Sequence, residues 1–213
     1  MKKLTIAIVA GGKLDKRFLK EIIRADRIIG VDRGAAWLLE QGVTPSVAIG
    51  DFDSVTKKEL RAIKKIVKDV REEPPHPKYA TDLELALDYA LGLKPREVII
   101  FGGIGTRLDH TIAAVHFLEK FLEKGINGKI IDERNEIILI RGKHSVLGHS
   151  PYRYLSILPH THKIVVSLTG FAYPLTRKEL IRSTSRGISN EITGEEAWIE
   201  VHEGIALVIK SRD

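Results

Sequence analysis

The sequence contains no cysteine, a single methionine and few aromatic residues, which make up 6% of its 213 residues. Without cysteine, the chain has no disulfide framework, no thiolate metal site and no cysteine nucleophile. No apolar run approaches the roughly 20 residues that are needed to span a bilayer. The apolar start at Leu4–Val9 ends in two glycines and is explained better by a first strand than by a signal peptide. These absences predict a cytoplasmic protein with no membrane partner.

Acidic residues are fewer than basic ones, and the formal net charge is +6. A positive charge suits either a nucleic acid or an anionic small substrate such as a nucleotide. The basic side chains are scattered along predicted helices such as residues 57–68, where acidic side chains alternate with them. No aromatic residues interleave with them to form a stacking platform for bases. We interpret most of this charge as solvated surface and expect no nucleic-acid partner.

Up to about residue 141, apolar strands alternate with amphipathic helices, which predicts a mostly parallel sheet with helices on both faces. Strands are expected at residues 4–9, 27–31, 47–49, 97–101 and 129–132, and helices at residues 14–24, 34–41, 57–67, 83–91 and 110–123. Residues 142–151 break this pattern. Short strand-like runs follow at residues 152–158, 163–168, 197–201 and 205–209, with a tight turn at Glu203-Gly204 between the last two.

This pattern predicts an α/β fold with two domains. We expect an N-terminal α/β domain over residues 1–144 and a small C-terminal all-β domain over residues 145–213. Ligands of parallel sheets bind beyond the carboxyl ends of the strands. Polar or glycine-rich segments stand at several such ends, namely Gly11-Gly12, Asp32-Arg33-Gly34, Gly50–Ser54 and Gly102–Gly105. Their positions predict a binding site at this edge of the sheet.

The segment Gly50–Ser54 carries two carboxylates, Asp51 and Asp53. On an extended segment, residues two apart point to the same side, so the two charges repel and call for a cation. Mg²⁺ fits best because it takes oxygen ligands, often one or two carboxylates together with substrate phosphates. Asp82 could complete the cluster, although Thr81 or Asp82 would also serve as the N-cap of the next helix. A polar turn that caps a helix is the alternative interpretation of Gly50–Ser54.

A glycine-rich loop at residues 102–110 lies between a predicted strand and a predicted helix. Glycines such as Gly103 and Gly105 let backbone N–H groups approach an anion at the N-terminus of the helix. Arg107 adds a bidentate donor for phosphate, and Lys78 could meet a phosphate as well. The loop matches neither a dinucleotide fingerprint nor a Walker A motif. A plain turn with Asp109 as the N-cap is the alternative.

In the predicted β domain, Ser189 and Asn190 follow Gly187. Small polar side chains that flank a glycine could hydrogen-bond a heterocyclic ligand. A plain β-turn explains these residues equally well. The sequence pattern leaves the two interpretations open.

Taken together, six segments resemble the thiamine pyrophosphokinase family in order and spacing over nearly the whole chain. They are Gly50–Ser54, Thr81–Glu84, Gly102–His110, Asp132–Ile140, Gly170–Leu175 and Gly187–Glu191. The resemblance implies an α/β nucleotide domain followed by a β-sandwich domain, in a homodimer with the thiamine site between subunits. It also implies transfer of a pyrophosphoryl group from ATP to the thiamine hydroxyl, with Mg²⁺ and with release of AMP.

The resemblance implies a role for each matching residue. Asp51, Asp53 and Asp82 match the family's metal-binding acids, Arg107 and Asp109 its glycine-loop pair, and Ser189 and Asn190 its thiamine-contacting segment. We expect Asp53, Asp82, Arg107 and Asp109 to be catalytic, with Asp109 also near thiamine. We expect ATP to be bound by Asp32, Arg33, Gly34, Lys78, Gly103, Gly105 and Arg107.

Two other functions are compatible with the sequence. One is a pyrophosphokinase for a different heterocyclic alcohol, such as a hydroxymethyl-pterin, against which the Ser189-Asn190 segment argues. The other is a nucleotide- or RNA-binding module without catalysis, which the basic charge suggests. Asp51, Asp53 and Asp82 weigh against that module, because acidic clusters repel phosphate unless a metal intervenes.

Overall fold

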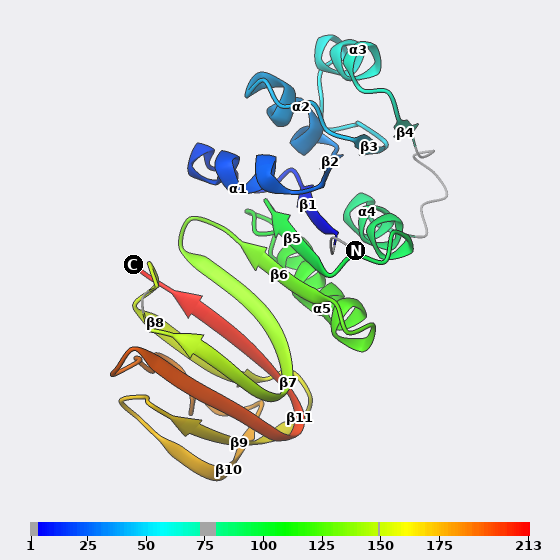
Figure 1. Cartoon of the computed structure of the whole chain (residues 1–213). Coiled ribbons are helices and arrows are strands. Elements are labelled where there is room, and N and C mark those ends of the chain that lie inside the picture. The colour runs from blue at the N-terminus through cyan, green and yellow to red at the C-terminus, as the bar shows by residue number, and fades with distance from the viewer. Residues whose placement is uncertain (1–3, 73–79, 149) are drawn as a thin grey trace. The chain divides into compact units, whose positions relative to one another are not determined.

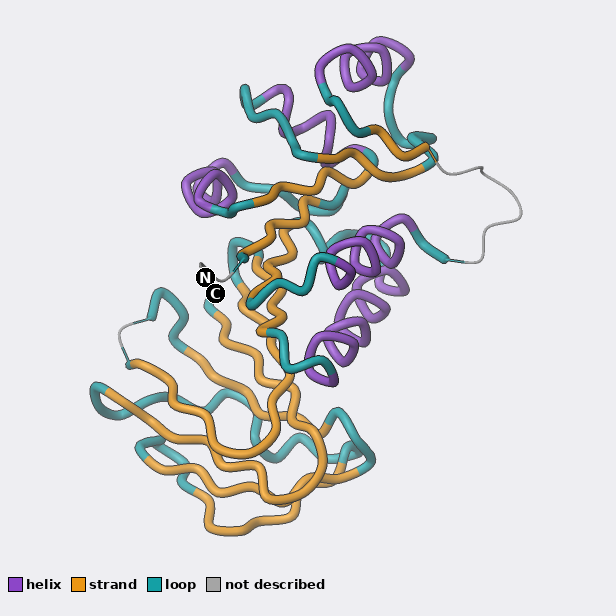
Figure 2. Tube along the Cα trace, turned by 45° about the vertical axis from the view of Figure 1, so that its right-hand side comes forward, coloured by secondary structure: helices purple, strands orange, loops and turns teal. Residues whose placement is uncertain are grey.

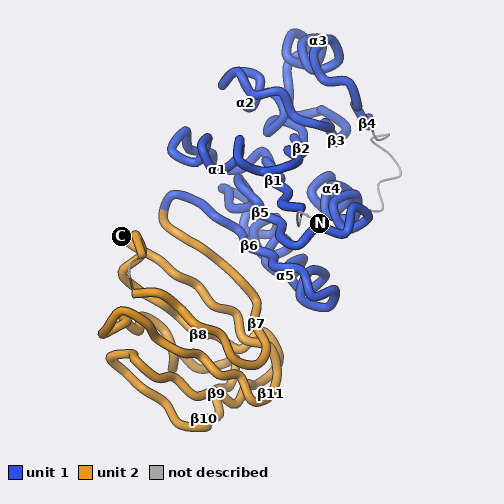
Figure 3. The backbone as a smooth tube through the Cα atoms, in the orientation of Figure 1, with its two compact units in different colours: residues 1–133 blue, residues 134–213 orange. Residues whose placement is uncertain are grey.

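The computed structural model describes residues 4–72, 80–148 and 150–213 (Figure 1). The chain forms two compact units, residues 1–133 and residues 134–213 (Figure 3). Among the described residues, no helix combines the length and the apolar character that crossing a membrane requires. The division expected at residues 144/145 falls inside a continuous strand of the second unit.

The first unit is built on a parallel sheet in the order β6-β5-β1-β2-β3-β4. Its strands are β1 (Thr5–Val9), β2 (Arg27–Val31), β3 (Val47–Gly50), β4 (Val70–Glu72), β5 (Glu97–Phe101) and β6 (Asn127–Ile131). The strands at the centre are buried along almost their whole length. This burial explains why they are continuously apolar. The pairings between neighbouring strands are all parallel, which confirms the predicted sheet. The short edge strand β4 was not predicted, because three residues with exposed charges give no strand pattern.

Helices cover both faces of this sheet (Figure 2). They are the short 3₁₀ helix η1 (Lys16–Phe18) and the α-helices α1 (Leu19–Arg24), α2 (Arg33–Glu40), α3 (Lys57–Ile66), α4 (Asp82–Gly92) and α5 (Leu108–Glu123). On one face, Ile22 of α1 and Leu38 of α2 pack with Val9 and its neighbours. Helices α4 and α5 lie on the other face.

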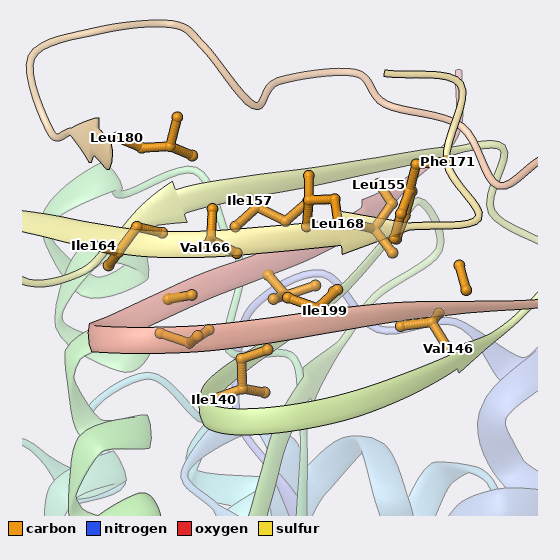
Figure 4. Packing of buried hydrophobic residues seen from close by; sticks show 14 residues of the cluster. Ile140, Val146, Leu155, Ile157, Ile164, Val166, Leu168, Phe171, Leu180 and Ile199 are labelled. Carbon is orange, nitrogen blue, oxygen red and sulfur yellow. The ribbon is translucent and has the colours of Figure 1, made fainter. Parts of the chain in front are cut away.

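The second unit is antiparallel throughout its described strands. These are β7 (Asn135–Leu147), β8 (Tyr154–Pro159), β9 (Lys163–Thr169), β10 (Leu175–Ile181) and β11 (Glu196–Ser211). Strand β11 pairs with β7 along its length, with β9 in its first half and with β8 in its second half. Buried residues such as Ile157, Val166 and Ile199 form the core of this unit (Figure 4).

The tight turn predicted at Glu203-Gly204 is wrong, because both residues lie inside β11. The register of β11 shifts between Val201 and Ala206, so the chain forms a bulge and continues in the same direction. Gly204 has a φ of +80°, and a Cβ there would lie 2.6 Å from the carbonyl oxygen of Lys163. Glycine therefore permits a bulge at this close approach. The prediction failed because a Glu-Gly pair between two apolar runs looks the same in the sequence whether it forms a hairpin turn or a bulge.

Candidate functional site

A cavity of about 850 Å³ lies in the first unit, at the ends of β1, β2 and β5 and at the N-termini of α4 and α5. Several residues that the sequence predicted for the site line it, namely Asp32, Arg33, Asp53, Asp82, Gly103, Gly105, Arg107 and Asp109. This is where ligands of parallel sheets bind. The structure therefore brings these side chains and glycines together around one space.

Three carboxylates gather at one side of this edge. Asp32, Asp51 and Asp82 each offer an oxygen atom, and these atoms all lie within 4.8 Å of one another. Asp32 follows β2, Asp51 follows β3, and Asp82 is the first residue of α4. Asp51 and Asp82 were expected in a metal site, whereas Asp32 was expected to contact ATP. The signal for Asp32 was its position after β2, the parallel neighbour of β3.

The carboxylate of Asp32 is held by the start of the next loop. Its Oδ1 accepts a hydrogen bond of 3.0 Å from the backbone N–H of Phe52. Gly50 makes this approach possible, because a Cβ at residue 50 would lie 2.0 Å from that same oxygen. Asp32 itself has a positive φ of 46°, which is uncommon for a residue with a side chain. Gly50 is therefore required for the position of the Asp32 carboxylate.

The segment Gly50–Ser54 is not extended, which corrects the geometry assumed for Asp51 and Asp53. Phe52 has a φ of +56°, and the backbone N–H of Asp53 donates a 3.1 Å hydrogen bond to Asp51 Oδ1. The ring of Phe52 is buried with Ala36 and Ile63, and this packing accompanies the turn in the backbone. As a result, Asp53 lines the cavity but does not belong to the close group of described carboxylates.

The electrostatics of the group favour a bound cation. Burial, together with the nearby negative charge of Asp82, raises the pKa of Asp32 to about 7, and Asp51 adds to the effect. Such a shift means that the ionised carboxylates repel one another where water screens them poorly. A hard divalent cation such as Mg²⁺ takes oxygen ligands of this kind. The donor set of Asp32, Asp51 and Asp82 therefore fits Mg²⁺.

The glycine-rich loop after β5 is fixed by the loop after β1. The N–H of Gly12 donates to the carbonyl oxygen of Gly102 at 3.0 Å, and the N–H of Lys13 donates to that of Ile104 at 2.8 Å. A Cβ on Gly12 would lie 2.4 Å from the Gly102 oxygen, so the two backbones can approach only because residue 12 is glycine. Gly12 also lines the cavity, at a strand end where the sequence predicted the site.

Gly34 has a packing role that the sequence did not predict. A Cβ at this position would lie 2.0 Å from the carbonyl oxygen of Val9, so glycine lets α2 pack directly on the end of β1. Gly34 is buried and does not line the cavity. Lys78, which was expected to contact ATP, lies outside the described residues.

Arg107 and Asp109 form a bidentate ion pair at the start of α5. Arg107 Nη2 lies 2.6 Å from Asp109 Oδ2, and Nε lies 3.2 Å from Oδ1. Both side chains are exposed. Hydrogen bonding from Arg107 holds the pKa of Asp109 below its usual value. Arg107, rather than Asp109, occupies the N-cap position of α5, so the N-cap that the alternative interpretation gave to Asp109 is wrong.

Among the cavity-lining side chains that were not predicted for the site are Glu84 of α4 and Phe117 of α5. Lys120 Nζ donates to Glu84 Oε1 at 2.8 Å and to Asp88 Oδ1 at 3.0 Å, which joins α4 to α5. Glu84 was predicted only as part of a capping box. The N–H of Glu84 does donate to the hydroxyl oxygen of Thr81, at 3.2 Å. Phe117 carries no signal in the sequence beyond that of an apolar helix residue.

Ser189 and Asn190 lie in the second unit, between β10 and β11. Ser189 is exposed, with a φ of +57°, and its N–H donates to Ser156 Oγ at 3.0 Å. Asn190 is buried, with 2% of its surface exposed. A ligand could therefore reach Ser189 from solvent, whereas Asn190 is closed to it.

Comparisons with known proteins agree with this geometry. Residues 18–130 match the family model for the thiamin pyrophosphokinase catalytic domain, and residues 141–206 match that for its vitamin B1 binding domain. A thiamine pyrophosphokinase from Bacillus subtilis (strain 168) is 35% identical, and the match covers 98% of this chain and 99% of the relative.

Solved structures give the same result for the fold. The crystal structure of the Bacillus subtilis thiamine pyrophosphokinase has a TM-score of 0.91 at 35% identity, covering 98% of this chain and 99% of that one. The thiamin pyrophosphokinase from Geobacillus thermodenitrificans has a TM-score of 0.89 at 33% identity, covering 99% and 98%. Yeast thiamin pyrophosphokinase shares the fold, with a TM-score of 0.85 at 15% identity, covering 100% and 87%. The resemblance seen in the sequence is confirmed, and the chain belongs to the thiamine pyrophosphokinase family.

Proposed function

We propose that this chain transfers the pyrophosphoryl group of ATP to the hydroxyl of thiamine in an Mg²⁺-dependent reaction, with ATP bound in the cavity of the first unit. Membership of the family implies ATP-dependent pyrophosphate transfer to thiamine. The observation that carries the metal requirement is the group of Asp32, Asp51 and Asp82, whose oxygens lie within 4.8 Å of one another. The glycine-rich loop beside it provides the anion site that the ATP phosphates need.

Asp32, Asp51 and Asp82 would hold the cation, which would neutralise charge on the phosphate oxygens when it is bound. Asp51 is oriented by the N–H of Asp53, and Asp32 by that of Phe52. Asp53 lines the cavity from the same loop. Asp53 stays a predicted ligand of the cation.

In the reaction, the thiamine hydroxyl oxygen attacks the β-phosphorus of ATP. The bond between this phosphorus and the oxygen bridging to the α-phosphorus breaks, and AMP leaves with that oxygen. Arg107 and the N–H group of Gly103 would donate to the phosphate oxygens, where charge accumulates in the transition state. The N–H of Gly105 donates to Thr111 Oγ1 at 3.3 Å, so this glycine would serve by leaving room for phosphate. Positioning of both substrates supplies most of the remaining rate enhancement.

The hydroxyl proton must be accepted by a base or by solvent. Asp109 lines the cavity, and its hydrogen bonds with Arg107 lower its pKa, which makes it a weak base for as long as that pair is intact. Asp82, the other carboxylate, would be engaged with the cation. Arg107 would then act on phosphate after exchanging Asp109 for a phosphate oxygen.

For the second unit, we propose that Ser189 contacts thiamine and that the chain works as a homodimer with the thiamine site near the interface. A small β unit gains stability from packing against a partner. Mixing a Ser189→Ala, Asn190→Ala chain with an Asp53→Asn chain tests the shared site. Recovery of turnover that neither parent shows supports it, and no recovery despite proven subunit exchange contradicts it.

The proposed reaction is tested by following phosphorus NMR signals of ATP with thiamine, with and without Mg²⁺. We expect equal amounts of AMP and thiamine pyrophosphate, formed only when both thiamine and Mg²⁺ are present. Formation of ADP would contradict attack at the β-phosphorus. A hydroxymethyl-pterin in place of thiamine is the matched control, and its preferred turnover would favour the other pyrophosphokinase function.

A further inference from the structure

The amide side chain of Asn190 is occupied by the protein's own backbone. Its Oδ1 accepts the N–H of Tyr173 at 3.0 Å and the N–H of Glu191 at 3.0 Å, and its Nδ2 donates to the carbonyl oxygen of Tyr173 at 2.9 Å. Two N–H donors face one end of the amide and a carbonyl faces the other, so the orientation of the amide is determined by its partners. Both acceptor positions of Oδ1 are used.

These bonds join two segments that are distant in the sequence. Tyr173 belongs to the turn between β9 and β10, whereas Asn190 belongs to the segment between β10 and β11. The backbone of Asn190 also exchanges hydrogen bonds of 3.0 and 2.8 Å with Leu155 of β8. The N–H of Ala172 donates to the carbonyl oxygen of Glu191 at 2.9 Å, which continues the pairing. Asn190 is therefore the point at which β8 and both segments are fixed together.

The exposed groups of this region surround the buried amide. Tyr173 is 69% exposed and Ile188 is 49% exposed, while Asn190 is 2% exposed. Ser189, the residue before Asn190, is exposed, and its N–H donates to Ser156 Oγ. A ligand on this surface would meet these neighbours and not the Asn190 side chain. Their spacing depends on the two segments staying joined.

We propose that Asn190 is a positioning residue, which holds the segment of Ser189 against that of Tyr173 and does not contact the substrate. This inference rests on the proposed function, in which thiamine binds at Ser189. It departs from the substrate contact that the family resemblance implies for Asn190. Burial carries the distinction, since only 2% of Asn190 is exposed, and its Oδ1 already accepts two N–H bonds and has no position left for a ligand.

The experiment compares Asn190→Ala with the wild type in two measurements on the full chain. Amide hydrogen exchange without substrates is expected to become at least about ten-fold faster at Tyr173 and Glu191, because a buried acceptor is lost. The KM for thiamine is expected to rise about ten-fold, with the KM for ATP and kcat within about two-fold of the wild type. In a Ser189→Ala background, Asn190→Ala is expected to raise the KM much less, because its effect passes through Ser189.

Thr193→Val is the matched control. Thr193 Oγ1 donates to the carbonyl oxygen of Gly170 at 3.1 Å, so this change removes a side-chain bond between the same segments away from Tyr173. It is expected to leave the KM for thiamine within about two-fold. Asn190→Ser serves as a milder change if Asn190→Ala fails to fold.

Three results would overturn the inference. The first is a raised KM with unchanged exchange at Tyr173 and Glu191, which would mean direct contact. The second is faster exchange with an unchanged KM, which would mean a purely structural role. The third is full additivity with Ser189→Ala. A wild type that never converts thiamine would instead refute the proposed function, and the exchange measurement would still report whether Asn190 joins the segments.

Discussion

The two units of the chain place their candidate functional groups in different ways. In the first unit, the groups stand directly after parallel strands or at helix N-termini, so the topology alone brings Asp32, Asp51 and Asp82 to one edge. In the second unit, Ser189 and Asn190 lie outside the strands, in a segment held by individual hydrogen bonds to β8 and to Tyr173. Sites of the first kind are visible in a sequence pattern, while sites of the second kind depend on contacts that no pattern shows.

The largest expected effect is that of Asp32→Asn. The amide can still accept the N–H of Phe52, but it is a weaker ligand for a hard cation, so turnover should fall by about 100-fold or more. Steady-state kinetics at saturating Mg²⁺ measures this loss. Glu84→Gln, a change in another carboxylate lining the cavity, is the control and should retain far more activity. Equal losses in both variants would refute a special role for Asp32.

Although Asp32→Asn should lower turnover, it should raise the stability of the metal-free protein. The pKa of Asp32 is raised to about 7, so in metal-free protein the stability it contributes is present at acidic pH and is lost as the pH rises through 7. Asp32→Asn removes the charge, and it should stabilise the metal-free protein at pH 8 by about 1–3 kcal/mol. Thermal unfolding at pH 5 and pH 8 checks this. A destabilised variant at pH 8 would contradict the proposed repulsion.

Gly12→Ala tests the glycine loop of the first unit. A Cβ would collide with the carbonyl oxygens of Gly102 and Ile104, both backbone atoms, so the loop must move. We expect kcat/KM for ATP to fall by roughly 30-fold or more, since misplaced groups lose catalytic geometry. Gly92→Ala is the matched control, because a Cβ there meets nothing within 4 Å. Similar kcat/KM values for ATP in the two variants would mean that the position of this loop does not matter for the use of ATP.

Arg107→Lys should have a smaller effect. Lysine keeps the positive charge but loses the planar fork that contacts phosphate through two N–H groups. We expect kcat/KM for ATP to fall by roughly ten-fold, on the scale of one charge-assisted hydrogen bond. An unchanged value would mean that Arg107 serves only its exposed pair with Asp109.

The sequence predicted most of the first unit because its signals are periodic or positional. The apolar strands, the cap at Thr81, and the positions of Asp51 and Asp82 follow from such signals. The N-cap of α3 is Thr56 and not a residue of Gly50–Ser54, which corrects the alternative interpretation of that segment. The sequence did not show that burial of Phe52 turns the backbone and separates Asp53 from the close carboxylate group. In the second unit, β10 was not predicted, because most of its residues are exposed and polar, and Gly204 was mistaken for a turn. The burial of Asn190 depends on Tyr173, 17 residues away in the chain.

The smallest expected effect concerns His144 of β7. Burial, with the nearby charge of Lys210, lowers the pKa of His144, so its stabilising effect is present above the unfolded pKa of about 6.5 and is lost as the pH falls through it. His144→Gln should therefore reduce the loss of stability between pH 7 and pH 5, with little effect on turnover. Urea unfolding at both pH values tests this. An unchanged pH dependence would show that His144 does not titrate differently on folding.

The central claim is that the carboxylates of Asp32, Asp51 and Asp82 form the divalent-cation site. Titration of the full chain with Mn²⁺, followed by electron paramagnetic resonance of the free ion, measures this directly. We predict a high-affinity site in the wild type that is lost in Asp32→Asn and in Asp51→Asn but kept in Glu84→Gln. Undiminished Mn²⁺ binding in Asp32→Asn and Asp51→Asn would contradict the account.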